Sequence, residues 1–182
     1  MIAIKRIDGT LIESVDVKTV IEAVEILVMK GVDLAEADLA EANLEGAKLA
    51  GAKLASADLN HARMSEADMS GADLSDANLD DAKLSFAKLI DAHLVGASMI
   101  GTYLYDADIT GADIDYAAWP LWCGSSDLTI DERQAKQLLA HALILAVGNG
   151  FVSKDWIIGE LIDYANEFHR IESGEFPKIA FD

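Results

Sequence analysis

An apolar residue returns every five positions through the middle of this chain. In the stretch GADLSDANLDDAKLSFAKLIDAHLVGASM, from Gly71 to Met99, alanine recurs at every fifth position, and a leucine or methionine follows each alanine two places later. On an α-helix five residues advance about 500°, so the apolar positions would be spread around the axis. On a β-strand an odd period would send alternate repeats to opposite faces. Neither regular element therefore buries the pattern.

A chain that turns a corner of constant hand every five residues does bury it. Four such segments close a square coil of twenty residues, and successive coils stack about 4.8 Å apart. Small alanines then lie beside the corners, and leucines fill the axis. The phase holds from Val32 to Tyr116 without insertion or deletion, which is seventeen repeats, with only Val32 and Thr102 replacing the expected alanine. We therefore expect a β-solenoid of about four coils.

The run ADLAEANLEGAKLAGAKLASADL resembles the pentapeptide-repeat family, whose pattern is A(D/N)Lxx. The resemblance covers nearly half of the chain and implies a mainly β fold, a right-handed quadrilateral parallel β-helix. It implies less about function, because most members of the family have no assigned role. Some members resemble duplex DNA in shape and charge and bind bacterial DNA gyrase, which makes DNA mimicry one alternative for this chain.

Residues 1–31 are expected to form an N-terminal hairpin and helix that cap the solenoid. The pair Asp8-Gly9, between IAIKRI and TLIESV, predicts a hairpin with a two-residue turn. A helix should follow over about Val17–Lys30, started either by a capping box from Thr19 to Glu22 or by Asp16. The first coil needs a cap because its backbone and core would otherwise be open. A separate binding activity of this unit is the alternative.

The β-helix is expected to span residues 32–119 and the C-terminal region, residues 120–182, to be α-helical. Trp119 falls at a leucine position, where its indole is too large for the axis, so we expect it to plug the end, a binding site being the alternative. Two amphipathic segments, TIDERQAKQLLAHALILAVGNG and SKDWIIGELIDYANEFHRI, predict an antiparallel helical pair. The pair must dock on the solenoid, on a second copy as a homodimer, or on another protein.

The net charge of −18 argues against direct binding to nucleic acid or to an anionic membrane. It favours either a basic protein partner or merely solubility. Cys123 is the only cysteine, which excludes an internal disulfide and fits a reducing compartment. The N-terminal sequence MIAIKRIDG lacks the features of a signal peptide, and LLAHALILAVG is too short to span a membrane. We therefore expect a soluble, cytoplasmic protein.

A square coil assigns each outward residue to one of four faces. Faces A, B, C and D begin at Leu34, Leu39, Leu44 and Leu49, and each recurs every twenty residues. Faces A and B each carry a net charge of −5, whereas faces C and D each carry −1. The A and B side therefore has roughly one charge per 2 Å, close to the one per about 1.7 Å of duplex DNA. On face D opposite charges alternate between coils and should stabilise the stack modestly, at Lys48, Asp68, Lys88 and Asp108.

Two candidate surfaces follow from this assignment. The candidate acidic partner surface consists of carboxylates on faces A and B: Asp38, Glu41, Asp58, Asp73, Asp76, Asp80 and Asp81. The candidate apolar docking or interface patch lies on faces C and D and consists of Phe86, Ile90, Tyr103 and Tyr105. We expect the helical tail or a dimer mate to cover the patch. A solvated acidic surface without a partner is the alternative for the first.

No catalytic, cofactor-binding or metal-binding constellation is apparent in the sequence. The four histidines are scattered, and the consecutive carboxylates of Asp80 and Asp81 should point apart at a corner. We therefore expect a non-enzymatic acidic module, without a cofactor, that presents a charged β-helix surface to a protein partner. One alternative is a DNA mimic that binds DNA gyrase or another DNA-binding protein. The other is a structural scaffold or oligomerisation protein that works through the helical tail.

Overall fold

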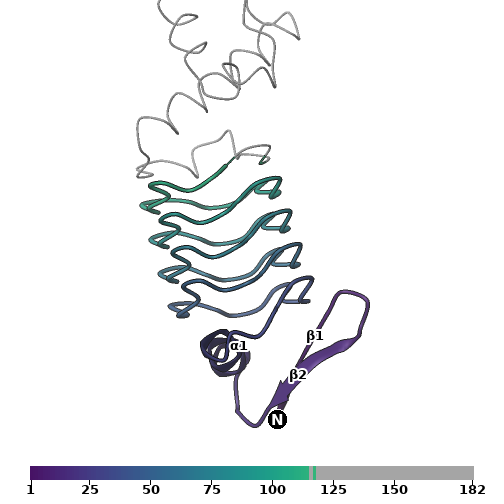
Figure 1. The fold of residues 1–182 in the computed structure, drawn as a ribbon. Coiled ribbons are helices and arrows are strands. Elements are labelled where there is room, and N and C mark those ends of the chain that lie inside the picture. The colour runs from purple at the N-terminus through teal and green to yellow at the C-terminus, as the bar shows by residue number, and fades with distance from the viewer. Residues whose placement is uncertain (115–116, 118–182) are drawn as a thin grey trace, which may run out of the picture. The chain divides into compact units, whose positions relative to one another are not determined.

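The computed structural model describes residues 1–114 and residue 117. It begins with two strands, β1 (Ile2–Lys5) and β2 (Leu11–Val15), and one helix, α1 (Val20–Met29). Stacked coils follow α1 (Figure 1). Trp119, Cys123 and the two helices expected in residues 120–182 lie outside the described residues, so these expectations stay predictions.

The coil of twenty residues is confirmed by the backbone pairing. From residue 33 to residue 113, residues twenty apart are joined by parallel bridges, as in the series Asp33, Lys53, Asp73, His93 and Asp113 of face A. Each bridge is one residue wide, because the chain turns a corner before a longer strand can form. The period of five is therefore a property of the corners, as the sequence predicts.

Backbone hydrogen bonds join each coil to the next in both directions. The N–H of Leu34 donates to the C=O of Lys53 at 2.9 Å, and the N–H of Asp58 donates back to the C=O of Ala37 at 2.9 Å. Within a coil, the N–H of Ala37 donates to the C=O of Leu34 at 3.0 Å and closes the corner. The same three bonds recur along the stack together with a fourth, in which the corner N–H donates to the next coil, as Glu36 does to the C=O of Ala55 at 2.9 Å. Few backbone groups are therefore left unpaired.

Each corner is a four-residue turn with its third residue in the left-handed region. Every fifth residue from Glu36 to Gly111 has a positive φ, for example 60° at Glu36 and 67° at Gly51. A bond from the fourth residue to the first, with a positive φ at the third alone, defines a type II turn. We call this third residue the corner residue. Its conformation explains why six of these sixteen positions are glycine.

The core is a set of leucine and alanine columns along the axis. The leucine positions, some filled by methionine or isoleucine, are at most 3% exposed from Leu34 to Ile114. Most alanines beside the corners are also buried, in agreement with the small residue expected there. Thr102, the one polar residue of this core, donates from its hydroxyl to the C=O of Leu79 at 2.8 Å. The hydroxyl is therefore satisfied at an alanine position.

The hairpin forms, but the two-residue turn predicted at Asp8-Gly9 is wrong. β1 and β2 pair antiparallel with an irregularity after Ile4, and Arg6 donates its N–H to the C=O of Thr10 at 2.8 Å. Gly9 has a φ of 86° and donates to the C=O of Arg6, so the loop is a turn followed by a left-handed glycine. The carboxylate of Asp8 accepts from the N–H and hydroxyl of Thr10, which favours this longer loop.

The predicted helix is shorter at both ends than expected. Thr19 and Glu22 form the capping box, which decides between the two predicted starts, and Glu22 accepts from the N–H of Thr19. The hydrogen bonds from residues 18 and 19 hold the pKa of the Glu22 carboxyl below its usual value. α1 turns Ala23, Val24 and Leu27 into the interior, where they are fully buried.

The hairpin and α1 supply partners for backbone groups of the first coil. The N–H of Asp38 donates to the C=O of Lys5 at 2.8 Å, in the place where Asp58 uses the coil beneath it. The N–H of Lys48 donates to the carboxylate of Glu25 at 2.8 Å. Two elements that precede the repeat thus replace the missing coil.

Within the described part of the chain, no helix is long and apolar enough to cross a membrane.

Shortening a leucine of the axis should strongly destabilise the fold. Leu59→Ala is expected to lower the free energy of unfolding by about 2–5 kcal/mol, because the surrounding ladder prevents collapse of the cavity. Leu59→Met is the matched control and should lose less than about 1.5 kcal/mol, since Met64 and Met69 occupy equivalent positions. Urea denaturation of both variants measures the difference. Equal losses would contradict a tightly filled axis.

Candidate functional site

The acidic side chains of the described coils gather on faces A and B. Between residues 33 and 113 these two faces carry ten carboxylates and one lysine, whereas faces C and D together carry six carboxylates and four basic residues. Parallel bridges align the residues of each face in columns along the stack. The charge asymmetry predicted from the sequence is therefore present in space. The individual carboxylates, however, do different work.

Aspartates that directly precede a leucine bind the backbone of their own corner. Asp58 accepts from the N–H of Asn60, and Asp73 from the N–H of Ser75, both at 3.1 Å. This N–H is the group that the ladder between coils leaves unused. Seven aspartates or asparagines make this bond, at residues 33, 43, 58, 68, 73, 78 and 108. The aspartate of the repeat is therefore explained by local structure.

Asp80 performs the same task for the coil above it. Ser98 precedes a methionine of face B, and it is Asp80 that accepts from the N–H of Ile100, at 2.9 Å. The carboxylate also accepts from the hydroxyl of Ser98 at 2.6 Å. Asp58, Asp73 and Asp80 of the predicted acidic surface thus have structural roles that the sequence analysis missed. For Asp80, the signal was a serine at residue 98, where aspartate or asparagine is usual, combined with the coil length of twenty residues.

Asp76 and Asp81 are corner residues with φ values of 56° and 55°. Their carboxylates lie against Gly96 and Gly101, the corner residues one coil above. Asp81 also lies 4.0 Å from the imidazole Nε2 of His61, in a pair whose side chains are each 56% exposed. These two carboxylates therefore face solvent at the corners that follow faces A and B, and each packs against the glycine one coil above.

Asp38 and Glu41 complete the predicted acidic surface. Both residues are exposed, and within the described residues neither carboxylate makes a hydrogen bond or ion pair. The seven predicted residues therefore fall into two groups. Asp58, Asp73 and Asp80 hold the fold, whereas the other four place charge on the surface without a bond to the backbone, at Asp38, Glu41, Asp76 and Asp81.

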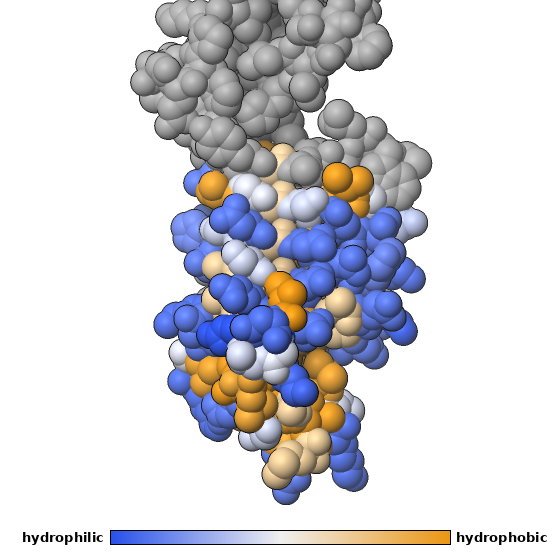
Figure 2. Space-filling model, turned by 90° about the vertical axis from the view of Figure 1, so that its right-hand side faces the viewer, coloured by the Kyte–Doolittle hydropathy of each residue, from blue (hydrophilic) through white to orange (hydrophobic). Residues whose placement is uncertain are grey.

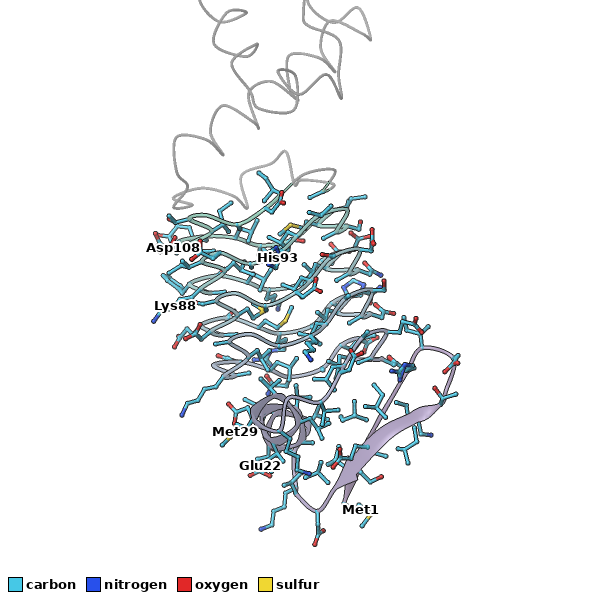
Figure 3. All side chains as sticks on the ribbon, in the orientation of Figure 1. Met1, Glu22, Met29, Lys88, His93 and Asp108 are labelled. Carbon is cyan, nitrogen blue, oxygen red and sulfur yellow. The ribbon has the colours of Figure 1, made fainter. Side chains whose placement is uncertain are left out.

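The alternating charges of face D are aligned as predicted but do not form close ion pairs. Lys88 and Asp108 lie one above the other on the same side of the stack (Figure 3). In the part of the chain that the structure describes, the close ion pairs lie elsewhere, as between Arg63 and Glu45 at 2.9 Å on face C. Asp68 instead accepts from the hydroxyl of Ser70 at 2.7 Å. The stacked charges thus contribute by proximity only.

Phe86, Tyr103 and Tyr105 come together on face C as predicted. Their exposed fractions are 52%, 44% and 43%, and the rings of Phe86 and Tyr105 meet edge to face at 5.5 Å. Ile90 is half-buried on the neighbouring face. The rings of Phe86 and Tyr105 are thus adjacent, and all three aromatic residues are partly accessible. That the tail or a dimer mate covers the patch stays a prediction.

A second apolar surface, which the sequence analysis missed, lies on the N-terminal unit. Figure 2 shows the hairpin side, where the coils are mostly hydrophilic and apolar side chains gather around the hairpin. Ile7 and Leu11, at the two ends of the hairpin loop, are each 57% exposed.

Among residues 1–114 and 117, no three histidine, cysteine, aspartate or glutamate side chains are grouped to hold a metal ion.

The contact between Asp81 and Gly101 predicts an unequal response of two glycines to alanine. Gly71→Ala should cost roughly 1–2 kcal/mol, because Gly71 has a φ of 64° but open space around a Cβ. Gly101→Ala should cost more, since its Cβ would also meet the Asp81 carboxylate. In an Asp81→Ala background the excess should disappear, as urea denaturation would show. An excess that persists there would contradict the contact.

The hydrogen bonds of Asp68 predict a loss of stability in acid. Two bonds from Ser70, with a smaller contribution from Lys88, hold the pKa of the Asp68 carboxyl below its usual 3.8. This contribution is present above the unfolded pKa and is lost as the pH falls through the lower folded pKa. Asp68→Asn retains an acceptor but does not titrate, so its unfolding free energy should fall less steeply below about pH 4. The unfolding free energies are measured by urea denaturation at several pH values. An equally steep fall with decreasing pH in both proteins would contradict this role of Asp68.

The comparisons with known proteins concern the coils. Residues 28–65, 37–76, 47–85 and 77–115 match the family model described as pentapeptide repeats, in eight copies. A crystal structure of alr5209, a pentapeptide repeat protein from Nostoc PCC 7120, is 27% identical with a TM-score of 0.50 and covers 65% of this chain and 100% of its own. This likeness supports a right-handed β-helix solenoid. No curated protein matches the sequence.

Two further structures match this chain with lower overall similarity. Rfr23, a pentapeptide repeat protein from the cyanobacterium Cyanothece 51142, is 28% identical with a TM-score of 0.35, over 52% of this chain and 60% of its own. QnrB1, a plasmid-mediated fluoroquinolone resistance protein, is 19% identical with a TM-score of 0.26, over 57% of this chain and 65% of its own. At these scores neither protein informs the function of this chain.

Proposed function

Because the chain belongs to the pentapeptide-repeat family, we propose that it is a non-enzymatic interaction module that presents faces A and B to a basic surface of a protein partner. The observation that supports this proposal is the group of acidic side chains that the fold does not use. Glu41, Asp76 and Asp81 make no bond to the backbone, yet they stand exposed along the same two faces. The structural need for aspartate at the repeat position does not account for them.

The chemistry of such a contact is charge pairing along regular columns. Corner carboxylates of one column lie two coils apart on these faces, as Glu41 and Asp81 do, which is about 10 Å, a distance that separate lysine or arginine side chains of a partner can match. The pairs would be solvent-exposed, so association should weaken as salt screens them. A cytoplasmic location belongs to the same proposal, as does a protein partner instead of nucleic acid or a membrane, which a net charge of −18 would repel.

A DNA mimic is the second candidate, and the regular bridges favour it. The four coil steps from residue 33 to residue 113 place the ten carboxylates of faces A and B along roughly 20 Å of axis. That density is near one charge per 2 Å, against about 1.7 Å for duplex DNA. A scaffold working through the C-terminal region is the third candidate, and it concerns residues outside those that the structure describes.

Charge reversal at the corners tests the proposal without breaking the fold. Asp76→Lys with Asp81→Lys should abolish low-salt capture of partner proteins by the immobilised full chain, as measured by mass spectrometry. Asp91→Lys, at the corner between faces D and A, is the control, because Asp91 has a φ of 55° and also lies against a glycine, Gly111. Partners retained by the double variant would contradict binding through faces A and B.

The DNA-mimic candidate has its own measurement. The wild-type chain should inhibit DNA supercoiling by gyrase, and Asp76→Lys with Asp81→Lys should lose the inhibition while Asp91→Lys retains it. Substitution of Asp58 or Asp80 would be a poor choice, because each binds backbone N–H or neighbouring side chains. An absence of inhibition by micromolar wild-type protein would remove the gyrase form of the proposal.

A further inference from the structure

Phe86 is an exception among the corner residues. The other corner residues from Glu36 to Gly111 are glycine, aspartate, glutamate, serine or histidine, and Phe86 is the one apolar side chain. Its φ of 63° is unfavourable for a bulky residue, and burial does not compensate, because 52% of the residue is exposed. The fold alone therefore does not explain a phenylalanine at this position.

The ring of Phe86 is held in place by a second aromatic ring. Phe86 and Tyr105 meet with centroids 5.5 Å apart and planes at 81°, and the N–H of Phe86 donates to the C=O of Tyr105 at 2.8 Å. The pair is thus ordered from both the backbone and the side chain. An ordered, half-exposed aromatic ring loses little conformational entropy when it binds a partner.

Two carboxylates lie in the same corner column, one coil below and one coil above the ring. They belong to Glu66 and Asp106, and both residues are exposed. The N–H of Glu66 donates to the C=O of Ser85 at 3.0 Å, which fixes the step to the coil of Phe86. Steps of about 4.8 Å place both carboxylates within one side-chain length of the ring.

The neighbouring column of face D keeps the local charge negative. Lys88, two residues after Phe86, lies between Asp68 and Asp108 in that column. Lys83, three residues before Phe86 on face C, is the other nearby lysine, and Arg63 of the same column pairs with Glu45 at 2.9 Å. Two lysines thus stand among four carboxylates around this corner, which are those of Glu66, Asp68, Asp106 and Asp108. An aromatic ring within such a group attracts a cation by its π face and by the surrounding charge.

We propose that the corner between faces C and D binds an arginine side chain of a partner protein. A planar guanidinium stacks on the Phe86 ring while its N–H groups donate to the carboxylates of Glu66 and Asp106. A lysine ammonium also donates to carboxylates but has no planar group that can stack on the ring, so the corner should prefer arginine. This corner is diagonally opposite the corner between faces A and B, and the proposal does not depend on binding there.

Two short peptides measure this discrimination by isothermal titration calorimetry with the full chain. The wild type should bind hexa-arginine more tightly than hexalysine. Phe86→Leu, which keeps an apolar residue but removes the π face, should weaken hexa-arginine binding about two- to fivefold and weaken hexalysine binding less. Asp76→Lys with Asp81→Lys should weaken both peptides alike, which separates the failure of this proposal from that of the proposed function.

Two conservative changes keep the test valid if Phe86→Leu does not fold. Phe86→Tyr retains the π face and should bind hexa-arginine as the wild type does, whereas Glu66→Gln with Asp106→Asn should reduce the preference for arginine. Nuclear Overhauser contacts between arginine Hδ and the Phe86 ring should appear in the complex. Equal affinities of the wild type for both peptides, or absence of those contacts, would overturn the proposal. Self-association of the wild type that Phe86→Leu loses would also overturn the proposal, since a second copy of the chain would then occupy the corner.

Discussion

The left-handed corner residue is the constraint on which the rest of this structure depends. Because every fifth residue has a positive φ and the following alanine N–H closes a type II turn, the chain changes direction after each leucine. Four such turns return the chain to its starting face, one ladder spacing higher. Of the five N–H groups in a segment, one closes the turn, three donate to the neighbouring coils, and the fifth donates to an aspartate or asparagine at many of the corners. In the repeat A(D/N)Lxx, the alanine N–H closes the turn, the aspartate or asparagine binds a backbone N–H, the leucine fills the axis, and the last residue is the corner residue.

The acidic residues of the protein differ in whether the backbone binds their carboxylates. An aspartate before a leucine, such as Asp73, would be selected in a protein with no partner, because the N–H of Ser75 requires an acceptor. A glutamate at a corner, such as Glu41, receives no such support. The net charge is therefore a sum of a structural part and a surplus. The surplus is the part that the fold does not explain, and it lies mainly on faces A and B.

The sequence was sufficient for the coil, its axis and the start of α1, because each has a periodic or local signal. Leu34 and its equivalents repeat in phase, and Thr19 and Glu22 are three residues apart, as a capping box requires. It was insufficient where two residues act across coils. Asp80 binds Ile100 twenty residues later, and Asp81 lies against Gly101, and neither contact has a signal until the coil length is combined with side-chain reach. The predicted length of the hairpin loop was wrong for a local reason, since the Asp8 carboxylate accepts from the N–H of Thr10 and favours a longer turn.

The ends of the stack follow from the same backbone requirement. A coil with no neighbour beneath it exposes N–H groups that water or another strand would take, and an open edge of this kind invites association between chains. Here the C=O of Lys5 and the carboxylate of Glu25 bind the N–H groups of Asp38 and Lys48, one from a strand and one from a helix. The repeat itself carries no stop signal at this end. Termination therefore requires residues outside the repeat, and their sequence cannot be periodic, because each replaces a different part of the missing coil.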